Sequence, residues 1–327
     1  KKIGFNDFSG GIAASGGTLS NLNALIAARN NAGLGTNPNS VLLVSEDAHS
    51  SFVKCIRVMG LDTTNLVRIK TDNQGRMDIN DLRKSLDKCS IENKKIFAIV
   101  ATLGTTVRGA IDPIKEISEI CKQRNIWLHI DGSIGGIFAI TSIPIEGLNN
   151  INQANSITIN PQKIIGITKT SSLLLVSNMS TLENTFNTGL PYISSKENII
   201  NRGEIGIQGS RPAEVIKLWL GLRFLGLKGI ENILKSSIKR KDFFVKNISK
   251  NKFDIYSGPL HIVSFLPNKL EPKDSDAWTQ TKVNELINNN FMLSRPKFKG
   301  KYFLRVVMGN YNTKDSHIEE LLRLLDA

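Results

Sequence analysis

Cysteine and aromatic residues are scarce in this sequence of 327 residues, and long apolar runs are missing from it. The three cysteines, Cys55, Cys89 and Cys121, lie far apart and form no CxxC pair. The pattern therefore favours neither a metal site nor a disulfide framework, and it fits a reducing cytosol. No segment approaches about 18 consecutive apolar residues, and the first residues carry no apolar stretch typical of a signal peptide. We therefore predict a cytoplasmic protein that does not span or enter a membrane.

Negative charge is also in short supply, because the formal net charge is +13. Small basic clusters occur at 235–241 and 297–301, which raises the possibility of a nucleic-acid partner. However, aromatics make up only 6% of the residues, and no recognition helix, RNA-recognition or zinc-finger pattern is present. We therefore interpret the charge as a basic solvated surface and predict no nucleic-acid partner. Such a field would also attract an anionic cofactor or substrate.

The first two thirds of the chain alternate short apolar runs with amphipathic ones, which is typical of an α/β fold. Asp112 and Pro113 resemble an N-cap followed by a first helical residue. Continuously apolar strands separated by helices predict a mainly parallel sheet covered on both faces. The expected strands are 41–44, 66–69, 96–101, 126–130, 156–159 and 172–176, and the expected helices are 19–30, 50–60, 78–88 and 112–124.

The pattern changes toward the C-terminus, after two further predicted helices at 213–225 and 230–247. We predict a large domain over residues 1–240 and a small C-terminal α+β domain over residues 241–327. The sequence shows no internal repeat and no low-complexity tract. The small domain is expected to contain strands at 254–256, 260–265 and 302–307 and helices at 278–288 and 315–325.

Polar residues recur where the expected parallel strands end. His49, Thr105, Asp131 and Lys163 each follow a different strand, and ligands of such sheets bind beyond the carboxyl ends of the strands. The run Ser15-Gly-Gly-Thr18 opens a helix, whose free amides and positive end suit a phosphate. A lysine, a carboxylate and a phosphate-binding helix start are what a pyridoxal 5'-phosphate (PLP) enzyme needs.

Each of these features also has a structural interpretation. A Gly-Gly-Thr sequence is an ordinary helix start, and Asp131 precedes glycines that form a turn. We prefer Lys163 to Lys169 as the reactive lysine because Lys163 directly follows the strand and the Asn160-Pro turn. His129 alternates with Asp131 on the same strand, and its expected role is structural or supporting.

Several segments in the same order resemble the group II PLP-dependent amino-acid decarboxylases, the family of glutamate, aromatic amino-acid and histidine decarboxylases. The resemblance covers about residues 9–226 well and implies the PLP-dependent transferase fold of type I. It is weaker toward the end, where Leu304-Arg-Val with Asn310 and Thr313 fits the closing segment of the family. The matching segments are Ala14–Arg29, Ser45–Lys54, Ala101–Pro113, Trp127–Asp131 and Ile207–Arg211 leading into Leu218-Trp219.

The resemblance implies a phosphate site and a departure from the family within it. Gly17 and Thr18 would bind the phosphate, and Asn160 would assist. The family normally has histidine before the Schiff-base lysine, but this sequence has Gln162. An amide can still donate to phosphate but cannot carry charge, so cofactor affinity or reaction type would differ.

The resemblance also implies how the cofactor ring is held. His49 would stack on the ring, Thr105 would lie near the ring hydroxyl, and Ser133 would lie beneath the ring. Asp131 would pair with the pyridine nitrogen, which keeps the ring an electron sink. Lys163 would form the Schiff base, and burial with nearby positive charge would lower its pKa.

Tyr192 falls where the mobile loop of the family carries a tyrosine that protonates the substrate carbon. The implied reaction is the conversion of an L-amino acid to its amine and CO2 by a homodimer. Gln162 keeps open another PLP-dependent lyase reaction or a deamination linked to decarboxylation. The sequence that resembles the family begins almost at the first residue, whereas family members usually have a substantial N-terminal segment. We therefore also consider a truncated chain or a catalytically degenerate PLP-binding protein.

Overall fold

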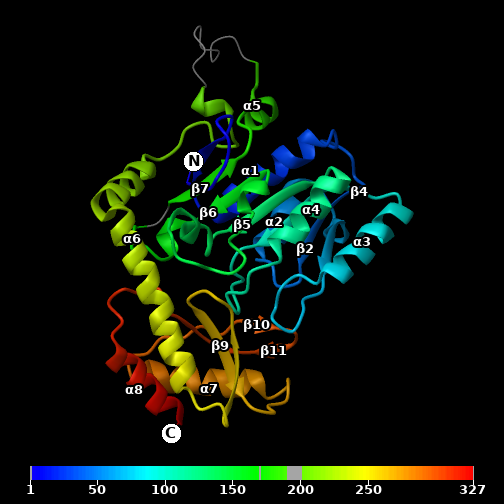
Figure 1. Ribbon diagram of the computed structural model, residues 1–327. Coiled ribbons are helices and arrows are strands. Elements are labelled where there is room, and N and C mark those ends of the chain that lie inside the picture. The colour runs from blue at the N-terminus through cyan, green and yellow to red at the C-terminus, as the bar shows by residue number, and fades with distance from the viewer. Residues whose placement is uncertain (1, 169–170, 190–200, 327) are drawn as a thin grey trace.

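A seven-stranded sheet forms the centre of the larger part of the molecule (Figure 1). The computed structural model describes residues 2–168, 171–189 and 201–326. The strand order is β1-β7-β6-β5-β4-β2-β3, so the chain crosses over repeatedly within the sheet. The strands are β1 Gly10–Ala14, β2 Ser40–Ser45, β3 Leu66–Ile69, β4 Lys95–Thr102, β5 Trp127–Gly132, β6 Ser156–Ile159 and β7 Ser172–Val176.

Strands β2 to β6 are parallel to one another, which confirms the predicted mainly parallel sheet. Strand β7 runs antiparallel to β6, and β1 runs antiparallel to β7. The sequence pattern did not indicate β1, because Gly10 and Gly11 give it a weak strand signal. Glycine is needed at position 11, where a Cβ atom would collide with the carbonyl oxygen of Leu174 on the neighbouring strand.

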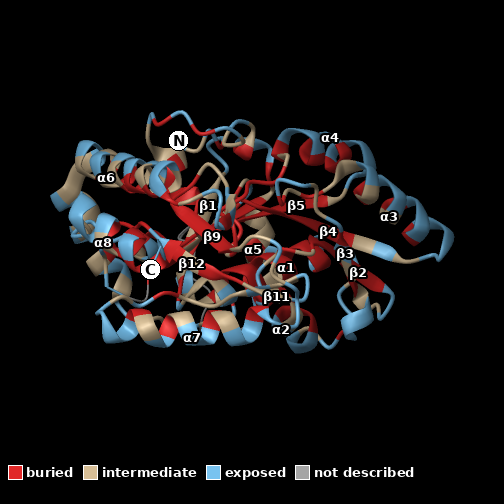
Figure 2. Cartoon of the chain, turned by 90° about the horizontal axis from the view of Figure 1, so that it is seen from below, coloured by how far each residue is buried: buried red, intermediate tan, exposed pale blue. Residues whose placement is uncertain are grey.

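Helices cover both faces of this sheet, and alternate strand residues explain why (Figure 2). Val41 and Leu43 of β2 pack in one apolar cluster with α3 and α4, whereas Leu42 and Val44 pack in another with α1 and α2. A strand buried on both faces is apolar at every position rather than at alternate ones. The helices are α1 Gly17–Asn31, α2 Ser51–Val58, α3 Ile79–Ile91, α4 Ile114–Arg124 and α5 Ser180–Phe186.

The expected N-cap role of Asp112 is wrong. Helix α4 begins at Ile114 without a side-chain cap, and Asp112 instead accepts hydrogen bonds from the backbone N–H groups of Met77 and Thr102, both at 2.7 Å. The reason is that these buried N–H groups need an acceptor at the end of β4. Complete burial raises the pKa of Asp112 to about 7.

Helix α6, Glu214–Asn247, leads from the large sheet to a smaller part of the fold (Figure 1). It is interrupted at Gly226, which has φ 61° and ψ 175°, so the two helices predicted from the sequence are both present. Beyond it, β12, β9 and β8 form an antiparallel sheet with its own apolar cluster, which includes Phe244 and Phe265. The predicted domain boundary near residue 240 stays a prediction. The elements are β8 Phe253–Ser257, β9 Ile262–Pro267, α7 Ser275–Asn288, β10 Lys297–Phe298, β11 Lys301–Tyr302, β12 Leu304–Val307 and α8 Asp315–Asp326.

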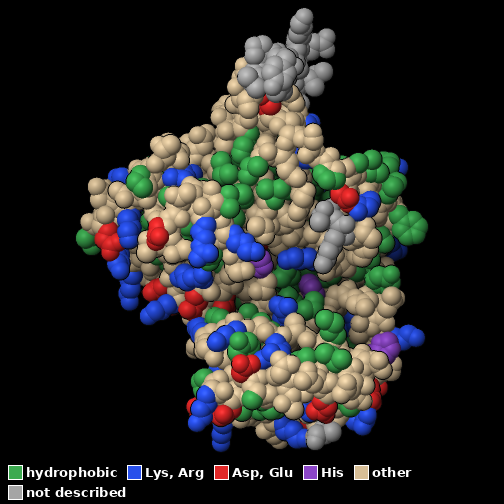
Figure 3. Space-filling view, turned by 180° about the vertical axis from the view of Figure 1, so that it is seen from behind, with side chains coloured by type: hydrophobic (Ala, Val, Ile, Leu, Met, Phe, Trp, Pro, Cys, Tyr) green, Lys and Arg blue, Asp and Glu red, His purple; other side chains and the backbone are tan. Residues whose placement is uncertain are grey.

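The smaller part contacts the loop that follows β4. Ser264 Oγ donates to the carbonyl of Val107, and an Arg305 guanidinium nitrogen donates to the carbonyl of Thr106. Figure 3 shows the molecule from behind, where Lys, Arg and His side chains gather between its upper and lower parts. Within the described ranges, we find no helix with both the length and the apolar character needed to cross a bilayer.

Candidate active site

A cavity of about 280 Å³ lies where the chain leaves four neighbouring parallel strands. Strands β6, β5, β4 and β2 are adjacent in the sheet, so the residues that follow them meet at one edge. The N-terminus of α1 closes the same cavity. The lining residues are Gly16, Gly17, Thr18, Asn21, His49, Ser51, Thr102, Gly104, Thr106, Asp131, Ser133, Ile134, Asn160, Gln162 and Lys163.

A second cavity is larger, about 650 Å³, but it has different chemistry. It lies beside the start of α4 and the β8–β9 turn, and Arg108, Asp112 and Tyr256 contribute to its wall. None of the predicted site residues is among the described residues that line it. We therefore assign the site to the smaller cavity, which is lined by the lysine, the carboxylate and the glycine-containing helix start predicted from the sequence.

Two side chains closely face Gly17 and leave no free space for a larger residue. A Cβ atom there would lie 2.5 Å from Asn160 Nδ2 and 3.0 Å from Ser133 Oγ. The preceding residue, Gly16, has φ 114° and ψ 159°, a conformation that L-residues rarely adopt. The first N–H groups of a helix have no partner within it, so this bare turn of backbone can bind an anion.

Asp131 is buried at the end of β5 and is held by two donors. Asn21 Nδ2 donates to one carboxylate oxygen at 3.2 Å, and the backbone N–H of Ser133 donates to the other at 3.1 Å. Asp131 is only 4% exposed, yet it contributes to the cavity wall. A buried carboxylate in this position needs a cationic or hydrogen-bonding partner on its cavity side.

Lys163 ends a short 3-10 turn, Pro161–Lys163, directly after β6. Its side chain is exposed because the cavity is open, yet the surrounding protein still restricts its hydration. Desolvation lowers the pKa of Lys163, Asp131 opposes that shift, and Arg305 adds to it. An amine with a lowered pKa is more often unprotonated and can act as a nucleophile.

His49 lies after β2, on the opposite side of the cavity lining from the β6 end. Its Nδ1 accepts a hydrogen bond from the backbone N–H of Ser51 at 3.1 Å. Desolvation lowers the pKa of His49, while Asp131 opposes that shift. A neutral ring with its proton on Nε2 is therefore favoured, which suits stacking on an aromatic ligand.

The structure brings together eight of the ten predicted site residues. Thr105 is not among them, because it is fully buried and its hydroxyl accepts the N–H of Ala110 at 3.1 Å. The next residue, Thr106, lines the cavity instead. Tyr192 lies outside the described residues. The eight residues are Gly17, Thr18, His49, Asp131, Ser133, Asn160, Gln162 and Lys163.

Other lining residues were not anticipated. Asn21 lies one helical turn after Gly17, so the spacing alone could have indicated it. Ser51 and Thr102 are buried, and their hydroxyl oxygens have no hydrogen-bond partner among the described residues. No periodicity in the sequence distinguishes Ser51 and Thr102 from ordinary buried residues.

These residues fit PLP. The Gly17 turn is shaped for a phosphate, and the unpaired hydroxyls of Ser51 and Thr102 can serve a bound polar group. A lysine amine and a buried carboxylate match the aldehyde and the ring nitrogen of the cofactor. The fold and the site together therefore define a fold type I enzyme that uses PLP.

Comparison with known proteins leads to the same conclusion. The family model described as "Pyridoxal-dependent decarboxylase conserved domain" matches residues 2–265. An aromatic-L-amino-acid decarboxylase of Bacillus atrophaeus is 30% identical over an alignment of 333 positions, which covers 99% of this chain and 69% of that protein. The acidic amino acid decarboxylase GADL1 of Xenopus tropicalis is 30% identical over 253 residues. This match covers 73% of this chain and about half (49%) of that relative.

Solved structures share the fold. Mouse CSAD matches 99% of this chain and 72% of its own chain, with a TM-score of 0.90 and 25% identity. Oryza sativa TDC with PLP and tryptamine matches 98% of this chain and 70% of its own chain, with a TM-score of 0.89. That second likeness, at 18% identity, shows the fold alone. The chain belongs to the pyridoxal-dependent decarboxylase family, which places it among the PLP-dependent lyases.

Proposed function

We propose that this chain removes the α-carboxylate of an L-amino acid as CO2 and releases the corresponding amine, with PLP bound covalently at Lys163. The observation that carries the proposal is the position of Lys163, Asp131 and Gly17 on the wall of one cavity. When bound, PLP supplies an electron sink conjugated to the α-carbon of the substrate. The protein residues then have to bind it, orient it and move protons.

The proposed division of work follows from the geometry. Gly17 and Thr18 begin α1, and Asn160 faces Gly17 from the end of β6; these three residues would bind the phosphate, with the amide of Gln162 in support. Asn160 is held in place because Ser172 Oγ donates to its Oδ1 at 2.5 Å.

The other residues would act on the ring and the substrate. Asp131 would accept a hydrogen bond from the protonated pyridine nitrogen, and His49 would cover one ring face, with Ser133 beneath the ring. The Lys163 amine would attach the cofactor and would later be regenerated. Thr105 is retained as a candidate near the ring hydroxyl, and Tyr192 as the acid that protonates the α-carbon.

A specific observation keeps a second reaction open. Gln162 lines the cavity as a neutral amide, so this position supplies no charge to the phosphate or substrate. The fold itself also serves a different product, since Rhodiola rosea 4-hydroxyphenylacetaldehyde synthase matches with a TM-score of 0.87 at 23% identity. The alternative is another PLP-dependent lyase reaction or a decarboxylation-linked deamination. A chain that binds PLP without turnover would be a degenerate relative.

The first experiment is reduction of the PLP-loaded protein with borohydride, followed by peptide mass spectrometry. We expect a phosphopyridoxyl group on Lys163 in the wild type and in Lys169→Ala, and none in Lys163→Ala. A label that persists in Lys163→Ala would contradict the proposal. An amino-acid screen then separates the reactions, because amine with CO2 indicates a decarboxylase and any other product indicates the alternative.

The assembly and the location of the protein are part of the same proposal. We expect a homodimer, as the resemblance to the family implies, a cytoplasmic location, as the cysteine pattern favours, and an amino acid as the small-molecule substrate. Sedimentation equilibrium of the PLP-loaded protein tests the dimer. A monomer with full activity would remove the dimer from the proposal.

A further inference from the structure

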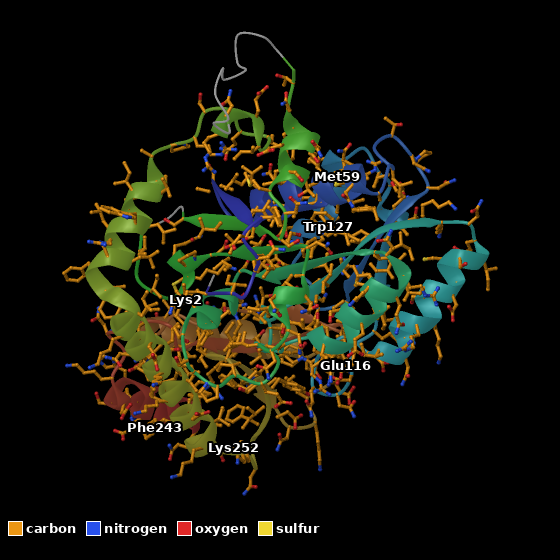
Figure 4. All side chains as sticks on the ribbon, turned by 45° about the horizontal axis from the view of Figure 1, so that its top comes forward. Lys2, Met59, Glu116, Trp127, Phe243 and Lys252 are labelled. Atoms are coloured by element: carbon orange, nitrogen blue, oxygen red, sulfur yellow. The ribbon has the colours of Figure 1, made fainter. Side chains whose placement is uncertain are left out.

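A series of hydrogen-bonded, buried side chains leads from Trp127 to Asp131, and its last member, Asn21, also lines the cavity. Trp127 Nε1 lies 2.8 Å from Ser156 Oγ, and Ser156 Oγ lies 2.8 Å from His129 Nδ1. His129 Nε2 lies 3.1 Å from Asn21 Oδ1. Asn21 Nδ2 then donates to Asp131 at 3.2 Å. Figure 4 labels Trp127 at the start of this chain, among the strands of the large sheet.

The donor and acceptor capacities fix the direction of this chain when Asp131 is ionised. An indole N–H can only donate, so Trp127 donates to Ser156, and a carboxylate can only accept, so Asn21 donates to Asp131. The Asn21 oxygen must then accept a proton from His129 Nε2. His129 Nδ1 is left as the acceptor for the Ser156 hydroxyl. Every bond therefore donates toward Asp131.

The opposite direction of donation would require Asp131 to be protonated. If Asn21 presented its oxygen to Asp131, the carboxyl group would have to carry a proton in order to donate. Asn21 would then donate to His129 Nε2, and the proton of His129 would move to Nδ1. The tautomer of His129 therefore reports the ionisation state of Asp131.

The side chains of this hydrogen-bonded series are almost completely buried. Asn21 is 1% exposed, and both His129 and Ser156 are 0% exposed. Burial also lowers the pKa of His129 to about 4, although Asp131 opposes the shift, so the ring is neutral at ordinary pH. The members come from α1, β5 and β6, and Asn21 follows Gly17 by one helical turn. The same helix therefore presents the phosphate-binding turn and the donor to Asp131.

We propose that Asn21, His129 and Ser156 are positioning residues that hold Asp131 ionised and oriented toward the pyridine nitrogen of PLP. This inference rests on the proposed function, because it assumes that PLP is the ligand of Asp131. Within the described part of the chain, each oxygen of Asp131 has one donor: Asn21 for one oxygen and the Ser133 backbone N–H for the other. The remaining lone pairs are left for the cavity side. If this hydrogen-bonded series only satisfied buried polar groups, it would not influence how the ring nitrogen of PLP is bound.

The first test needs no cofactor. Protein labelled with 15N at histidine is studied by NMR without PLP between pH 5 and pH 8. We expect His129 to be neutral with its proton on Nε2 throughout this range. A proton on Nδ1, or a charged ring, would overturn the inference because the chain would then not donate toward an ionised Asp131.

The second test compares cofactor analogues. Dissociation constants are measured for PLP and for its analogue in which a C–H group replaces the ring nitrogen. Asn21→Ala should weaken PLP binding by roughly tenfold to a hundredfold, the usual range for a lost hydrogen bond to a charged group. It should change binding of the nitrogen-free analogue much less, since that ring does not engage Asp131.

Asn23→Ala is the matched control, because Asn23 lies on the same helix and is equally buried but bonds to Leu19 and Ile207. It should leave the ratio of the two constants unchanged. Equal weakening of both ligands by Asn21→Ala would show a merely structural role and overturn the inference. If Asn21→Ala does not fold, Ser156→Ala tests the same hydrogen-bonded series. It should shift the ratio of the two dissociation constants in the same direction.

The outcomes distinguish this inference from the proposed function. Wild type without a phosphopyridoxyl group on Lys163 would contradict the proposed function itself. Normal attachment at Lys163, together with an unchanged ratio in Asn21→Ala and Ser156→Ala, would contradict only the positioning role.

Discussion

Replacement of Gly17 by alanine tests whether the turn before α1 is a phosphate site rather than an ordinary helix start. The new methyl group would point at Asn160 Nδ2, 2.5 Å away, and at Ser133 Oγ, 3.0 Å away. The first distance is too short for a real contact and the second is tight, so Asn160 has to rotate. That rotation breaks the hydrogen bond that Ser172 donates to Asn160.

The effects on stability should nearly cancel. Loss of one neutral hydrogen bond costs about 1 kcal/mol. Alanine is favoured over glycine in a helix by up to about 1 kcal/mol, and the backbone of Gly17 is not in the left-handed region. The free energy of unfolding of the apoprotein should therefore change by less than about 1 kcal/mol. PLP binding should weaken by at least about tenfold, because the methyl group fills the turn and displaces a predicted phosphate contact.

The assay pairs urea unfolding of the apoprotein with PLP titration followed by absorbance. Gly35→Ala is the control, because a Cβ atom there meets nothing within 4 Å, and it should leave PLP affinity unchanged. If Gly17→Ala bound PLP as tightly as the wild type, Gly17 would be only a helix start. Strong destabilisation of the apoprotein would refute the energy balance.

Two further predictions concern Asp47 and Tyr192. Burial raises the pKa of Asp47 from 3.8 to about 6, so the folded protein binds a proton more tightly than the unfolded chain does. The resulting stabilisation is complete below pH 3.8 and is lost as the pH rises through about 6, a decrease of at most about 3 kcal/mol. Urea unfolding of Asp47→Asn should lack this decrease, and a variant that retained it would show that another group is responsible. Tyr192→Phe should keep the phosphopyridoxyl label on Lys163 but slow CO2 release, whereas unchanged turnover would remove Tyr192 from the mechanism.

Much of the large sheet could be predicted from the sequence. Strands β3, β6 and β7 have the expected bounds, and the others among those predicted begin or end within one or two residues of expectation. The reason is that strands buried on both faces are apolar throughout, which is a local signal. Strand β1 carries no such signal, since Gly11 is required by the close approach of β7 and Gly10 by that of Met179.

The candidate site was predicted less completely, because some of its contacts join residues that are far apart in the sequence. Lys163, Asp131 and His49 could be recognised because each lies at the end of a strand or a few residues beyond it. Thr105 shows the limit of that argument, since the turn after β4 buries its side chain and exposes Thr106 to the cavity. The bond between Arg305 and Thr106 joins residues about two hundred positions apart, and no local pattern indicates it.

The sequence by itself determined the α/β pattern, the family and the residue types at the strand ends. These depend on local periodicity and on short segments that can be compared directly with the family. Only the tertiary structure decided that Asp112 serves two backbone N–H groups rather than a helix end, and that Asn21 connects His129 to Asp131. Both depend on which buried donors and acceptors meet after the strands have packed, and burial leaves them no water with which to pair.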